Sequence, residues 1–398
     1  MTHDAPRFAA ALSTSSNLRD AAREAASRAK AQLGATPHLA VVFASSDHAE
    51  DFAALAEILS DELGSACLLG CTGESILCNG REVEGASALA VWLGHLPGVA
   101  LLPMHLDFDP NADGGSFFGW HESLGDDWPT DASMLLLAEP FTFPTDRLLQ
   151  QLDEERPPLP VFGGMASGGR GPGQNRLLLG GRTFDRGAAA VLLRGPVRVR
   201  GVVSQGCRPI GRPFVVTKAQ RNVILELSGR PPLEQLQELF GTLSADEQHL
   251  ARQGLHVGQV INEYQEQFGR GDFLVRNVQG ADPETGAIAI GDLVRVGRTV
   301  QFHVRDADTA DEDLEALLAA ARQNSQADCL GALVFTCNGR GSRLFDQPHH
   351  DAQALDRSWP QLPVAGFFAQ GEIGSVGGKN FLHGFTASIA LFEAASDS

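Results

Sequence analysis

The chain repeats one order of segments three times: a strand, a helix, a second strand and, after glycine-rich turns, a closing strand. The first strands span residues 39–44, 134–138 and 332–336, and the second strands begin at residues 68, 161 and 364, which is 27 to 32 residues downstream. Helical patterns fill the intervals at 49–63, 145–155 and 350–359, and the closing strands are 86–93, 188–193 and 385–392. A strand–helix–strand crossover needs such an interval. The repeats therefore predict a layered α/β (α+β) fold with mixed sheets and with ligand groups on the loops at strand ends.

The length of the chain indicates two domains, because a single hydrophobic core rarely serves 398 residues. The expected parts are an N-terminal helical extension at 1–35, a first domain at 36–215 and a second domain at 216–398. An amphipathic pattern at 8–33 predicts the helix of the extension, with Ser16 or Asn17 as its cap. Related strand–helix–strand units are expected in both domains.

Two further stretches differ from the repeats. Alternating apolar residues between 198 and 227 predict antiparallel strands, and short runs at 273–277, 287–290 and 299–304 predict a small meander. The stretch 107–130 is rich in Asp, Gly and aromatic residues, which is typical of a long surface loop.

Charge and composition exclude several classes of partner. The formal net charge of −18 argues against nucleic acid and anionic membranes, which both require a positive protein surface. No apolar run is long enough to span a bilayer, and the N-terminus lacks the plan of a secretory signal. The six cysteines are spread widely, as in proteins with reduced thiols. We therefore expect a cytoplasmic protein.

The first candidate ligand site follows the strand that begins at residue 68. Cys71, Thr72, Gly73 and Glu74 place a thiol, a hydroxyl and a carboxylate at the carboxyl end of that strand, where open α/β sheets bind ligands. Glu74 would bind an amine or a guanidinium group. The alternative is structural: Glu74 caps the next turn, and Cys71 packs in the core.

The second candidate site follows the strand at 332–336. Cys337, Asn338, Gly339, Arg340 and Arg343 combine a thiol, an amide and two guanidinium groups around a turn. Two arginines can hold a carboxylate or a phosphate through paired hydrogen bonds. The alternative is that the Asn-Gly pair forms a plain turn and that the arginines pair with acidic neighbours.

The third candidate site repeats a Gly-Glu pair after the strand that begins at 364. Gly371 and Glu372 match the pair at residues 73 and 74, which indicates either a shared pocket or a shared turn geometry. His383 is a candidate ligand of haem or a metal, but a buried histidine bonded to a carbonyl group is the simpler interpretation. We expect no metal site and no cofactor.

Common catalytic motifs are missing from the sequence. It contains no GxSxG, no GxxxxGK[ST], no HExxH and no pair of CxxC motifs. We therefore assign no catalytic residues. Catalysis by a cysteine nucleophile, either Cys337 or Cys71, stays open as an alternative.

Four segments resemble the FIST proteins, a family named for F-box and intracellular signal transduction and built from a FIST-N and a FIST-C domain. They are GCTGES at 70–75, GREVEGASALAV at 80–91, FTCNGRGSRLF at 335–345 and VAGFFAQGEIGSVGGKNFLHGFTASIALF at 364–392. The resemblance implies that 36–215 is the FIST-N domain and 216–398 the FIST-C domain. It also implies a sensory module for small molecules such as amino acids, and some relatives bind haem. The first 35 residues are too few for an F-box, so we expect a stand-alone protein that acts through a separate signalling partner.

The sequence therefore predicts a non-enzymatic sensor of a small ligand that carries a carboxylate and an amine. In this hypothesis Arg340 and Arg343 bind the anion, Glu372 or Glu74 binds the cation, and Asn338 orients the ligand. The alternatives are a cysteine-dependent enzyme, a haem-based gas sensor with His383 as the ligand, and a protein–protein adaptor. The sequence gives no indication of the oligomeric state.

Overall fold

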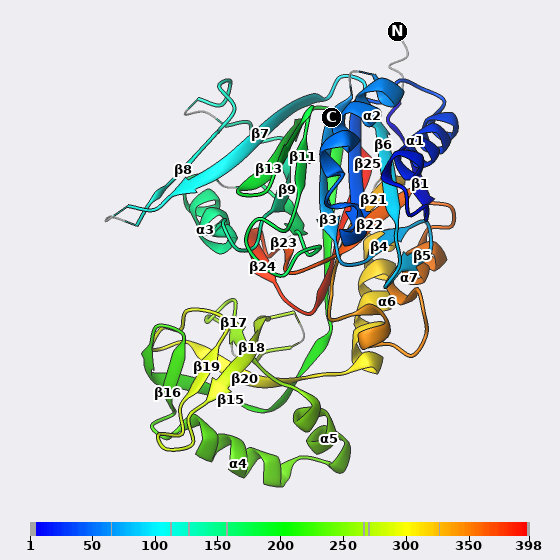
Figure 1. Ribbon diagram of the computed structural model, residues 1–398. Coiled ribbons are helices and arrows are strands. Elements are labelled where there is room, and N and C mark those ends of the chain that lie inside the picture. Colours follow the sequence, from blue (N-terminus) through cyan, green and yellow to red (C-terminus); the bar gives the residue numbers. More distant parts are fainter. Residues whose placement is uncertain are drawn as a thin grey trace. The chain divides into compact units, whose positions relative to one another are not determined.

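The computed structural model describes residues 5–64, 66–111, 114–125, 128–156, 158–265, 267–269, 271–325 and 327–395. Helices and mixed sheets alternate along the chain, which confirms the predicted α/β class (Figure 1). None of the helices in these ranges combines the length and the apolar character that crossing a membrane requires.

The chain forms two compact units. The first consists of Met1–Val203, Glu315–Leu382 and Thr386–Ser398, and the second consists of Ser204–Leu314 and His383–Phe385. The expected boundary at residue 215 falls inside strand β15 (Cys207–Gln220), so the compact units do not follow it. The stretch expected as an extension supplies a strand and a helix of the first unit.

Three repeats of one plan supply the elements of the first unit, and a few elements of the third repeat extend into residues of the second unit. The first repeat is β1 (Arg7–Ser13), α1 (Leu18–Leu33), β2 (Leu39–Ser45), α2 (Phe52–Leu63), β3 (Cys67–Gly73), β4 (Ile76–Cys78), β5 (Arg81–Val83) and β6 (Leu89–His95). The second is β7 (Ala100–Asp109), β8 (Ser116–Phe118), β9 (Ala132–Ala138), α3 (Thr145–Glu155), β10 (Val161–Met165), β11 (Leu177–Leu179), β12 (Arg182–Phe184) and β13 (Ala188–Arg194). The third is β14 (Val197–Gln205), α6 (Ala307–Gln323), β21 (Cys329–Cys337), α7 (His350–Ser358), β22 (Val364–Ala369), β23 (Glu372–Val376), β24 (Lys379–His383) and β25 (Thr386–Ala394).

Each repeat keeps two parallel strands in its own sheet and gives a hairpin to a neighbouring repeat. The parallel pairs are β2 with β3, β9 with β10, and β21 with β22. The hairpin β4–β5 then pairs with β22 of the third repeat, β11–β12 pairs with β3 of the first, and β23–β24 pairs with β10 of the second. The exchange closes a cycle, so no repeat completes its sheet alone.

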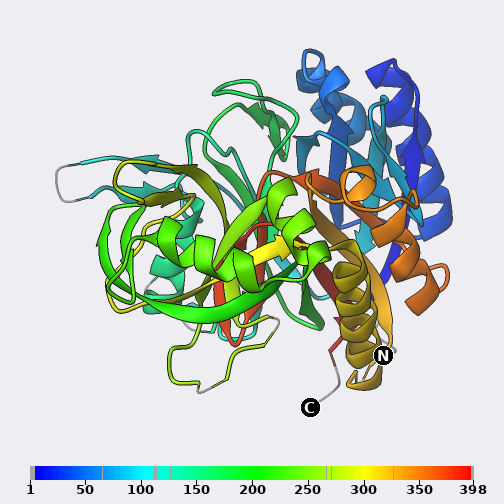
Figure 2. The ribbon, with the colours of Figure 1, turned by 90° about the horizontal axis from the view of Figure 1, so that it is seen from below.

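Helix α1 shows how the sequence fixes the ends of an element. The Asn17 side chain accepts a hydrogen bond from the Asp20 N–H group, and Gly34 ends the helix in a left-handed conformation with φ of 61°. The buried face of α1 consists largely of alanines, which allow the helix to lie close to α2 and to the sheet (Figure 2).

Residues 8–13 form part of strand β1, so the prediction of one helix over 8–33 is wrong for this segment. All seven residues of β1 pair with β6, from Arg7 opposite His95 to Ser13 opposite Leu89. The alanines in RFAAALS favour a helix when judged alone. Pairing with β6 and burial of the strand override that local preference.

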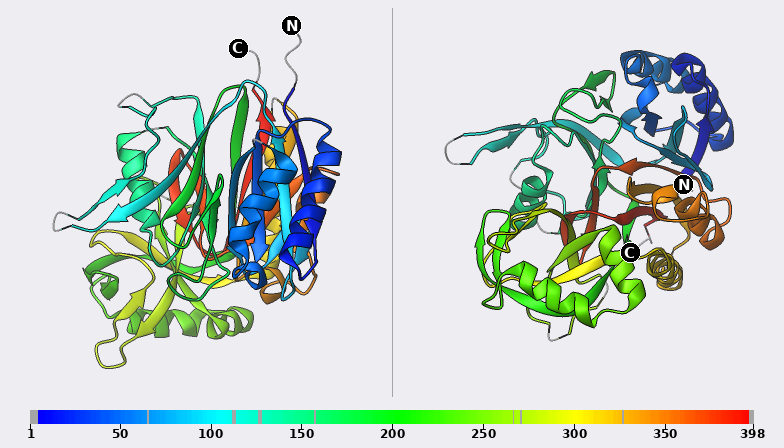
Figure 3. Two further views of the ribbon diagram at one scale, coloured as in Figure 1. Left: turned by 45° about the horizontal axis from the view of Figure 1, so that its top comes forward. Right: turned by 60° about the horizontal axis from the view of Figure 1, so that its bottom comes forward.

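Part of the stretch 107–130 forms a β-ribbon and not a plain surface loop. Residues 107–109 finish β7, and β8 turns back to pair with them, Asp107 opposite Phe118. Figure 3 shows this ribbon projecting from the first unit. Phe117 packs on Phe143 with ring centroids 5.5 Å apart, which anchors the ribbon to the core of the second repeat.

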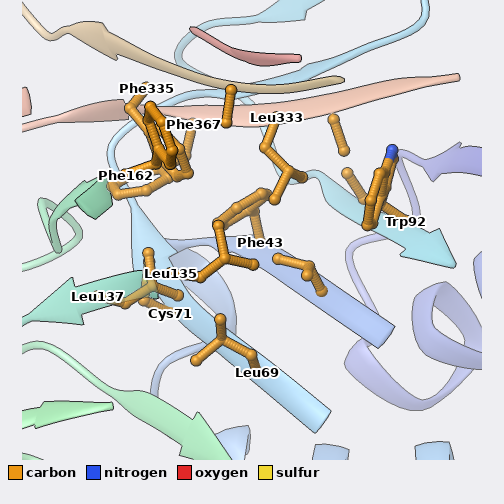
Figure 4. Packing of buried hydrophobic residues seen from close by; sticks show 14 of the residues in the cluster. Phe43, Leu69, Cys71, Trp92, Leu135, Leu137, Phe162, Leu333, Phe335 and Phe367 are labelled. Atoms are coloured by element: carbon orange, nitrogen blue, oxygen red, sulfur yellow. The ribbon is translucent and has the colours of Figure 1, made fainter. Parts of the chain in front are cut away.

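The central core of the first unit is shared by the three sheets (Figure 4). Phe43 of β2 lies 5.0 Å from Phe367 of β22 and 6.2 Å from Phe335 of β21, measured between ring centroids. Burying one such side chain contributes about 1.5–3 kcal/mol. Leu137 of β9 and Phe162 of β10 extend the same core to the second repeat.

The second unit is a closed barrel inserted in the chain between β14 and α6. Its elements are β15, β16 (Val223–Leu227), α4 (Pro232–Thr242), α5 (Ala245–Gln253), β17 (Leu255–Val260), β18 (Phe273–Ala281), β19 (Ile288–Ile290) and β20 (Thr299–Arg305). The strands predicted as a small meander are β18, β19 and β20, and they close against β15–β17. Leu239 of α4 packs into the barrel core.

The close contact between β21 and β22 depends on a glycine. A Cβ atom at Gly366 would lie 2.0 Å from the Val334 carbonyl oxygen. We expect Gly366→Ala to lower the free energy of unfolding by about 1–3 kcal/mol. Gly181→Ala is the matched control, because nothing lies within 4 Å of its Cβ position. Chemical denaturation compares the two variants, and equal midpoints would contradict this account of the packing.

Candidate functional site

The second strands of the three repeats meet at their carboxyl ends through three equivalent hydrogen bonds. In each bond, a backbone N–H group of the second strand donates to a carbonyl oxygen. That oxygen belongs to the residue just before the hairpin that pairs with this strand. The bonds are Thr72 N–H to Arg176 O (3.0 Å), Met165 N–H to Gly371 O (2.8 Å) and Phe368 N–H to Ser75 O (2.9 Å). The strand ends are therefore held in equivalent positions.

A second set of bonds, two residues further along, links the strand ends to one another. Ser167 N–H donates to Thr72 O at 3.1 Å, and Gln370 N–H donates to Met165 O at 3.0 Å. The third link passes through a side chain: Glu74 N–H donates to Ser167 Oγ at 2.8 Å, and that hydroxyl donates to Phe368 O. The Ser167 hydroxyl thus closes a ring of hydrogen bonds around the three repeats.

A cavity of about 510 Å³ opens at this ring, entirely within the first unit. We call it the three-repeat cavity, and its lining residues are Ser46, Glu74, Phe141, Ser167, Gly168, Gly169, Arg170, Asn338, Arg343 and Gln370. Glu74, Ser167 and Gln370 occupy equivalent places, since each lies two residues beyond the strand residue that makes the first set of bonds. One scaffold position therefore presents a carboxylate, a hydroxyl and an amide to the same space.

Glu74 and Arg343 form the main ion pair of the cavity. Arg343 Nη1 donates to Glu74 Oε2 at 3.1 Å, Nη2 donates to Oε1, and Nη1 also donates to the Asn338 carbonyl oxygen at 2.6 Å. Burial favours the protonated form of Glu74, but hydrogen bonds from Arg343 and Asn338 outweigh it and lower the pKa of the carboxyl group. Glu74 is therefore a carboxylate at neutral pH.

Arg170 supplies a second positive charge that no described residue neutralises by an ion pair. Its side chain is exposed in the cavity, and its charge also lowers the pKa of Glu74. The cavity therefore carries two cations, Arg170 and Arg343, against one carboxylate, in a chain whose net charge is −18. This local excess of positive charge attracts an anionic group.

A buried carboxylate fixes the glycine-rich wall that carries Arg170. Glu139 is fully buried, and its oxygens accept hydrogen bonds from Asn175 Nδ2 (3.0 Å), Thr142 Oγ1 (2.8 Å) and Phe141 N–H (3.0 Å). Asn175 Oδ1 in turn accepts from Gly169 N–H at 2.8 Å. Hydrogen bonds from the buried Glu139 through Asn175 therefore fix the position of this wall.

The structure brings only part of the sequence-predicted set to the cavity. Glu74, Asn338 and Arg343 line it together. Thr72 is buried beneath the ring, with Gly73 beside it at the end of β3, and Gly371 contributes a carbonyl oxygen to the bonds below the cavity. Gly339 lies in the turn between Asn338 and Arg343.

Arg340 points into the protein, not into the cavity. It is 1% exposed, and its Nε and Nη2 atoms donate to the two oxygens of Asp351 at 2.8 and 2.7 Å. Asp351 belongs to the first turn of α7, so this pair ties the turn at 338–343 to the helix. The alternative weighed from sequence, in which an arginine pairs with an acidic neighbour, describes Arg340.

Glu372, Cys71 and His383 are likewise buried. Thr386 N–H and Oγ1 donate to Glu372 Oε2 at 3.1 and 2.8 Å, which leaves that carboxyl inside the first unit. Cys71 is part of the central core, and His383 ends β24 with 3% exposure. In the part of the chain that the structure describes, no group of three or more His, Cys, Asp and Glu residues is placed to hold a metal ion.

Sequence reasoning missed the contributions of the second repeat and of Gln370. The glycine-rich run at 168–173 is visible in the sequence but has no distinctive motif. The usable signal was positional: Ser167 and Gln370 follow strands that correspond to the strand before Glu74. Aligning the three strand ends would have identified both residues.

Fold and site together define an α/β repeat protein with a polar, small-molecule-sized cavity at its strand ends. The chain belongs to the FIST family: the FIST N domain model matches residues 38–230 and the FIST C domain model matches residues 232–375. FIST domains are sensory domains of signal transduction.

Relatives of similar length align with almost the whole chain. A protein of Mycobacterium tuberculosis (strain ATCC 25618 / H37Rv), named only as uncharacterized, is 43% identical over 97% of this chain and 99% of its own length. A protein of Mycobacterium bovis (strain ATCC BAA-935 / AF2122/97), also named as uncharacterized, is 41% identical over 97% of this chain and 98% of its own. The crystal structure of cyanuric acid hydrolase from A. caulinodans aligns over 98% of this chain and 100% of that one, with a TM-score of 0.36 and 10% identity, too low to support an argument.

The two arginines of the 338–343 turn should differ sharply in their effect on stability. Arg340→Ala leaves the buried Asp351 carboxylate uncompensated, so we expect a loss of about 3–5 kcal/mol. Arg343→Ala removes a largely exposed pair and should cost less than about 1 kcal/mol. Urea denaturation of both variants measures the difference, and similar losses would contradict the assignment of the two side chains.

Glu372 should make stability depend on pH. Burial raises its pKa to about 8, although Thr386, Cys337 and Arg340 act in the opposite direction. A carboxyl group with a raised pKa contributes stability that is complete below the unfolded value of about 4.3 and is lost as the pH rises towards 8. The melting temperature of Glu372→Gln should therefore rise relative to wild type between about pH 5 and pH 8.

Glu57→Gln, a change at an exposed position of α2, is the control and should follow wild type across this range. A constant difference between Glu372→Gln and wild type would show that Glu372 does not carry the proton.

Proposed function

We propose that this chain is a sensory protein that binds a small ligand in the three-repeat cavity. One observation carries the proposal: Glu74, Ser167 and Gln370 occupy equivalent positions in the three repeats. Each repeat therefore gives the cavity a different polar group. A volume of about 510 Å³ lies in the range of small-molecule sites. The signal then passes to a separate protein partner.

An amino acid or a related metabolite is the ligand class that fits these groups best. Arg170 offers its guanidinium group to a carboxylate, and Glu74 offers a carboxylate to an ammonium group. Arg343 both orients Glu74 and adds positive charge on the anion side. Asn338 and Gln370 add amides that can bond to either end of such a ligand.

The revised set of ligand-binding residues is therefore Glu74, Ser167, Arg170, Asn338, Arg343 and Gln370. It keeps three members of the set predicted from sequence and replaces Arg340 by Arg170 as the partner of Arg343. None of the six cysteines, all of which the structure describes, forms a disulfide, which supports a reducing location such as the cytoplasm.

The alternative functions are a cysteine-dependent enzyme, a haem-based sensor and a protein–protein adaptor. Burial raises the pKa of the Cys71 thiol well above its usual range, so Cys71 is a poor nucleophile. Haem binding through His383 predicts a Soret band in protein that has taken up added haem. A pure adaptor predicts no response to any small molecule.

The test is a thermal-shift screen of the full chain with the common amino acids and with their deaminated and decarboxylated analogues. A true ligand raises the melting temperature in a saturable way, equivalent to about 2.7 kcal/mol at a hundred times Kd. We expect Arg170→Ala to weaken binding about 10- to 100-fold, because it removes a charged hydrogen-bond donor. The same variant should lose the preference for the carboxylate over the decarboxylated amine.

Arg194→Ala is the control, because Arg194 is an exposed arginine paired with Asp131, outside the cavity. A flat screen, or a ligand whose affinity Arg170→Ala leaves unchanged, would contradict the proposed site.

A further inference from the structure

Cys337 ends β21 directly before Asn338, and its surroundings differ from those of a plain structural cysteine. The residue is partly exposed, and its sulfur accepts a hydrogen bond from Gly339 N–H at 3.4 Å. The carboxyl group of Glu372 lies close enough for Cys337 to lower its pKa. Both Arg340 and Glu372 are buried beside it, with exposed fractions of 1% and 0%. A reachable thiol therefore borders a buried cation and a buried acid.

One nitrogen atom of the Arg340 guanidinium makes no hydrogen bond to the described residues. Asp351 occupies Nε and Nη2, while Nη1 is buried and has no hydrogen-bond partner among the described residues. Burial lowers the pKa of Arg340, but Asp351 outweighs it, and the charges of Cys337 and Glu372 act in the same direction as Asp351. The backbone keeps Arg340 beside Cys337, because Arg340 N–H donates to the Cys337 carbonyl oxygen at 2.8 Å. A buried N–H group without a partner is costly, which marks this place as one where an oxygen atom of a ligand would be stabilised.

Glu372 supplies a proton at the same place. Because burial raises its pKa to about 8, the carboxyl group is mainly neutral at pH 7. Its Oε2 atom is fixed by two hydrogen bonds from Thr386. When a sulfur nucleophile attacks a molecule, an acid held next to the sulfur can protonate the leaving group of that molecule.

Several other cysteines lack such an environment. Burial raises the pKa of Cys67 to about 11 and that of Cys78 and Cys329 to about 12, which makes these thiols unreactive at neutral pH. They provide an internal comparison within one molecule.

We propose that Cys337 is a hydroperoxide-reactive thiol, with Arg340 Nη1 binding the peroxide and Glu372 protonating the leaving oxygen. The Cys337 thiol first loses its proton to solvent. The thiolate sulfur attacks the terminal oxygen of a hydroperoxide, ROOH, so that an S–O bond forms and the O–O bond breaks. The leaving alkoxide takes the Glu372 proton and departs as ROH, and solvent returns a proton to Glu372. Sulfur is oxidised to sulfenic acid, and the hydroperoxide is reduced to an alcohol.

The arrangement suits a hydroperoxide better than a carbon electrophile. Breaking an O–O bond requires a donor to the peroxide oxygens and a proton for the leaving oxygen, which Arg340 and Glu372 can supply. Simple alkylation of a thiol needs neither group. This site is separate from the three-repeat cavity, because neither Cys337 nor Glu372 lines that cavity.

The experiment treats the full chain with hydrogen peroxide or tert-butyl hydroperoxide, traps sulfenic acid with dimedone, and assigns the labelled cysteines by peptide mass spectrometry. We expect Cys337 to be labelled at least about ten times faster than Cys67, Cys78 and Cys329. Cys337→Ser should lose this label. The rate should fall above about pH 8 as Glu372 loses its proton. The charged groups facing this pair are Arg340, with its partner Asp351, and Arg343 on the side of Cys337.

Glu372→Gln is the diagnostic variant, because an amide preserves the shape and the acceptor for Thr386 but cannot give up a proton. We expect it to react about 100-fold more slowly and to lose the fall in rate above pH 8. If Glu372 had only a structural role, the rate would still fall above pH 8 in the Glu372→Gln variant. Arg194→Ala removes an exposed arginine that pairs with Asp131 away from this site, so it serves as a folded control and should retain the rate.

Three results would overturn the proposal. One is equal dimedone labelling of Cys337 and the buried cysteines. A second is an unchanged rate and pH profile in folded Glu372→Gln protein. The third is fast reaction of Cys337 with iodoacetamide but reaction with hydroperoxides no faster than that of free cysteine, which would make it a nucleophile for carbon electrophiles instead.

Discussion

The exchange of hairpins between repeats is the interaction on which the rest of the first unit depends. Each repeat supplies two parallel strands but completes its neighbour's sheet instead of its own. The first set of hydrogen bonds at the strand ends follows from this exchange, because the residue before each hairpin places its carbonyl group opposite the second strand that receives the hairpin. Where the repeats are not identical, the Ser167 hydroxyl replaces a direct backbone link. The cavity is therefore a product of all three repeats.

Local patterns predicted the elements well, and non-local pairing explains the errors. The helix at 145–155 and the cap at Asn17 follow from short-range signals, and both agree with the structure. Residues 8–13 have a helical composition but become a strand because β6, more than 70 residues away, offers a complete edge. The hairpin partners could not be derived either, since nothing in residues 76–83 indicates that they will pair with β22.

The candidate site was predicted in part for the same reason. Arg340 and Arg343 stand three residues apart in one turn, and their sequence context is nearly the same. What separates them is the partner: Asp351 follows on the next helix and buries Arg340, whereas Glu74 comes from the first repeat and keeps Arg343 at the cavity. A short motif cannot reveal which partner the fold delivers. The family resemblance indicated a sensory protein but not which side chains face the ligand.

The scaffold is nearly three-fold, but its cavity is not, and this difference governs what the site can recognise. A symmetric set of three identical residues would favour a ligand with matching symmetry. Here Glu74, Ser167 and Gln370 differ, and the connection after β10 runs over residues 166–176 while the others need only 74–75 and 370–371. The longer connection adds Arg170 on one side of the cavity. A ligand with distinct acidic and basic ends can therefore bind in a single orientation, which a sensor needs if binding is to have one structural consequence.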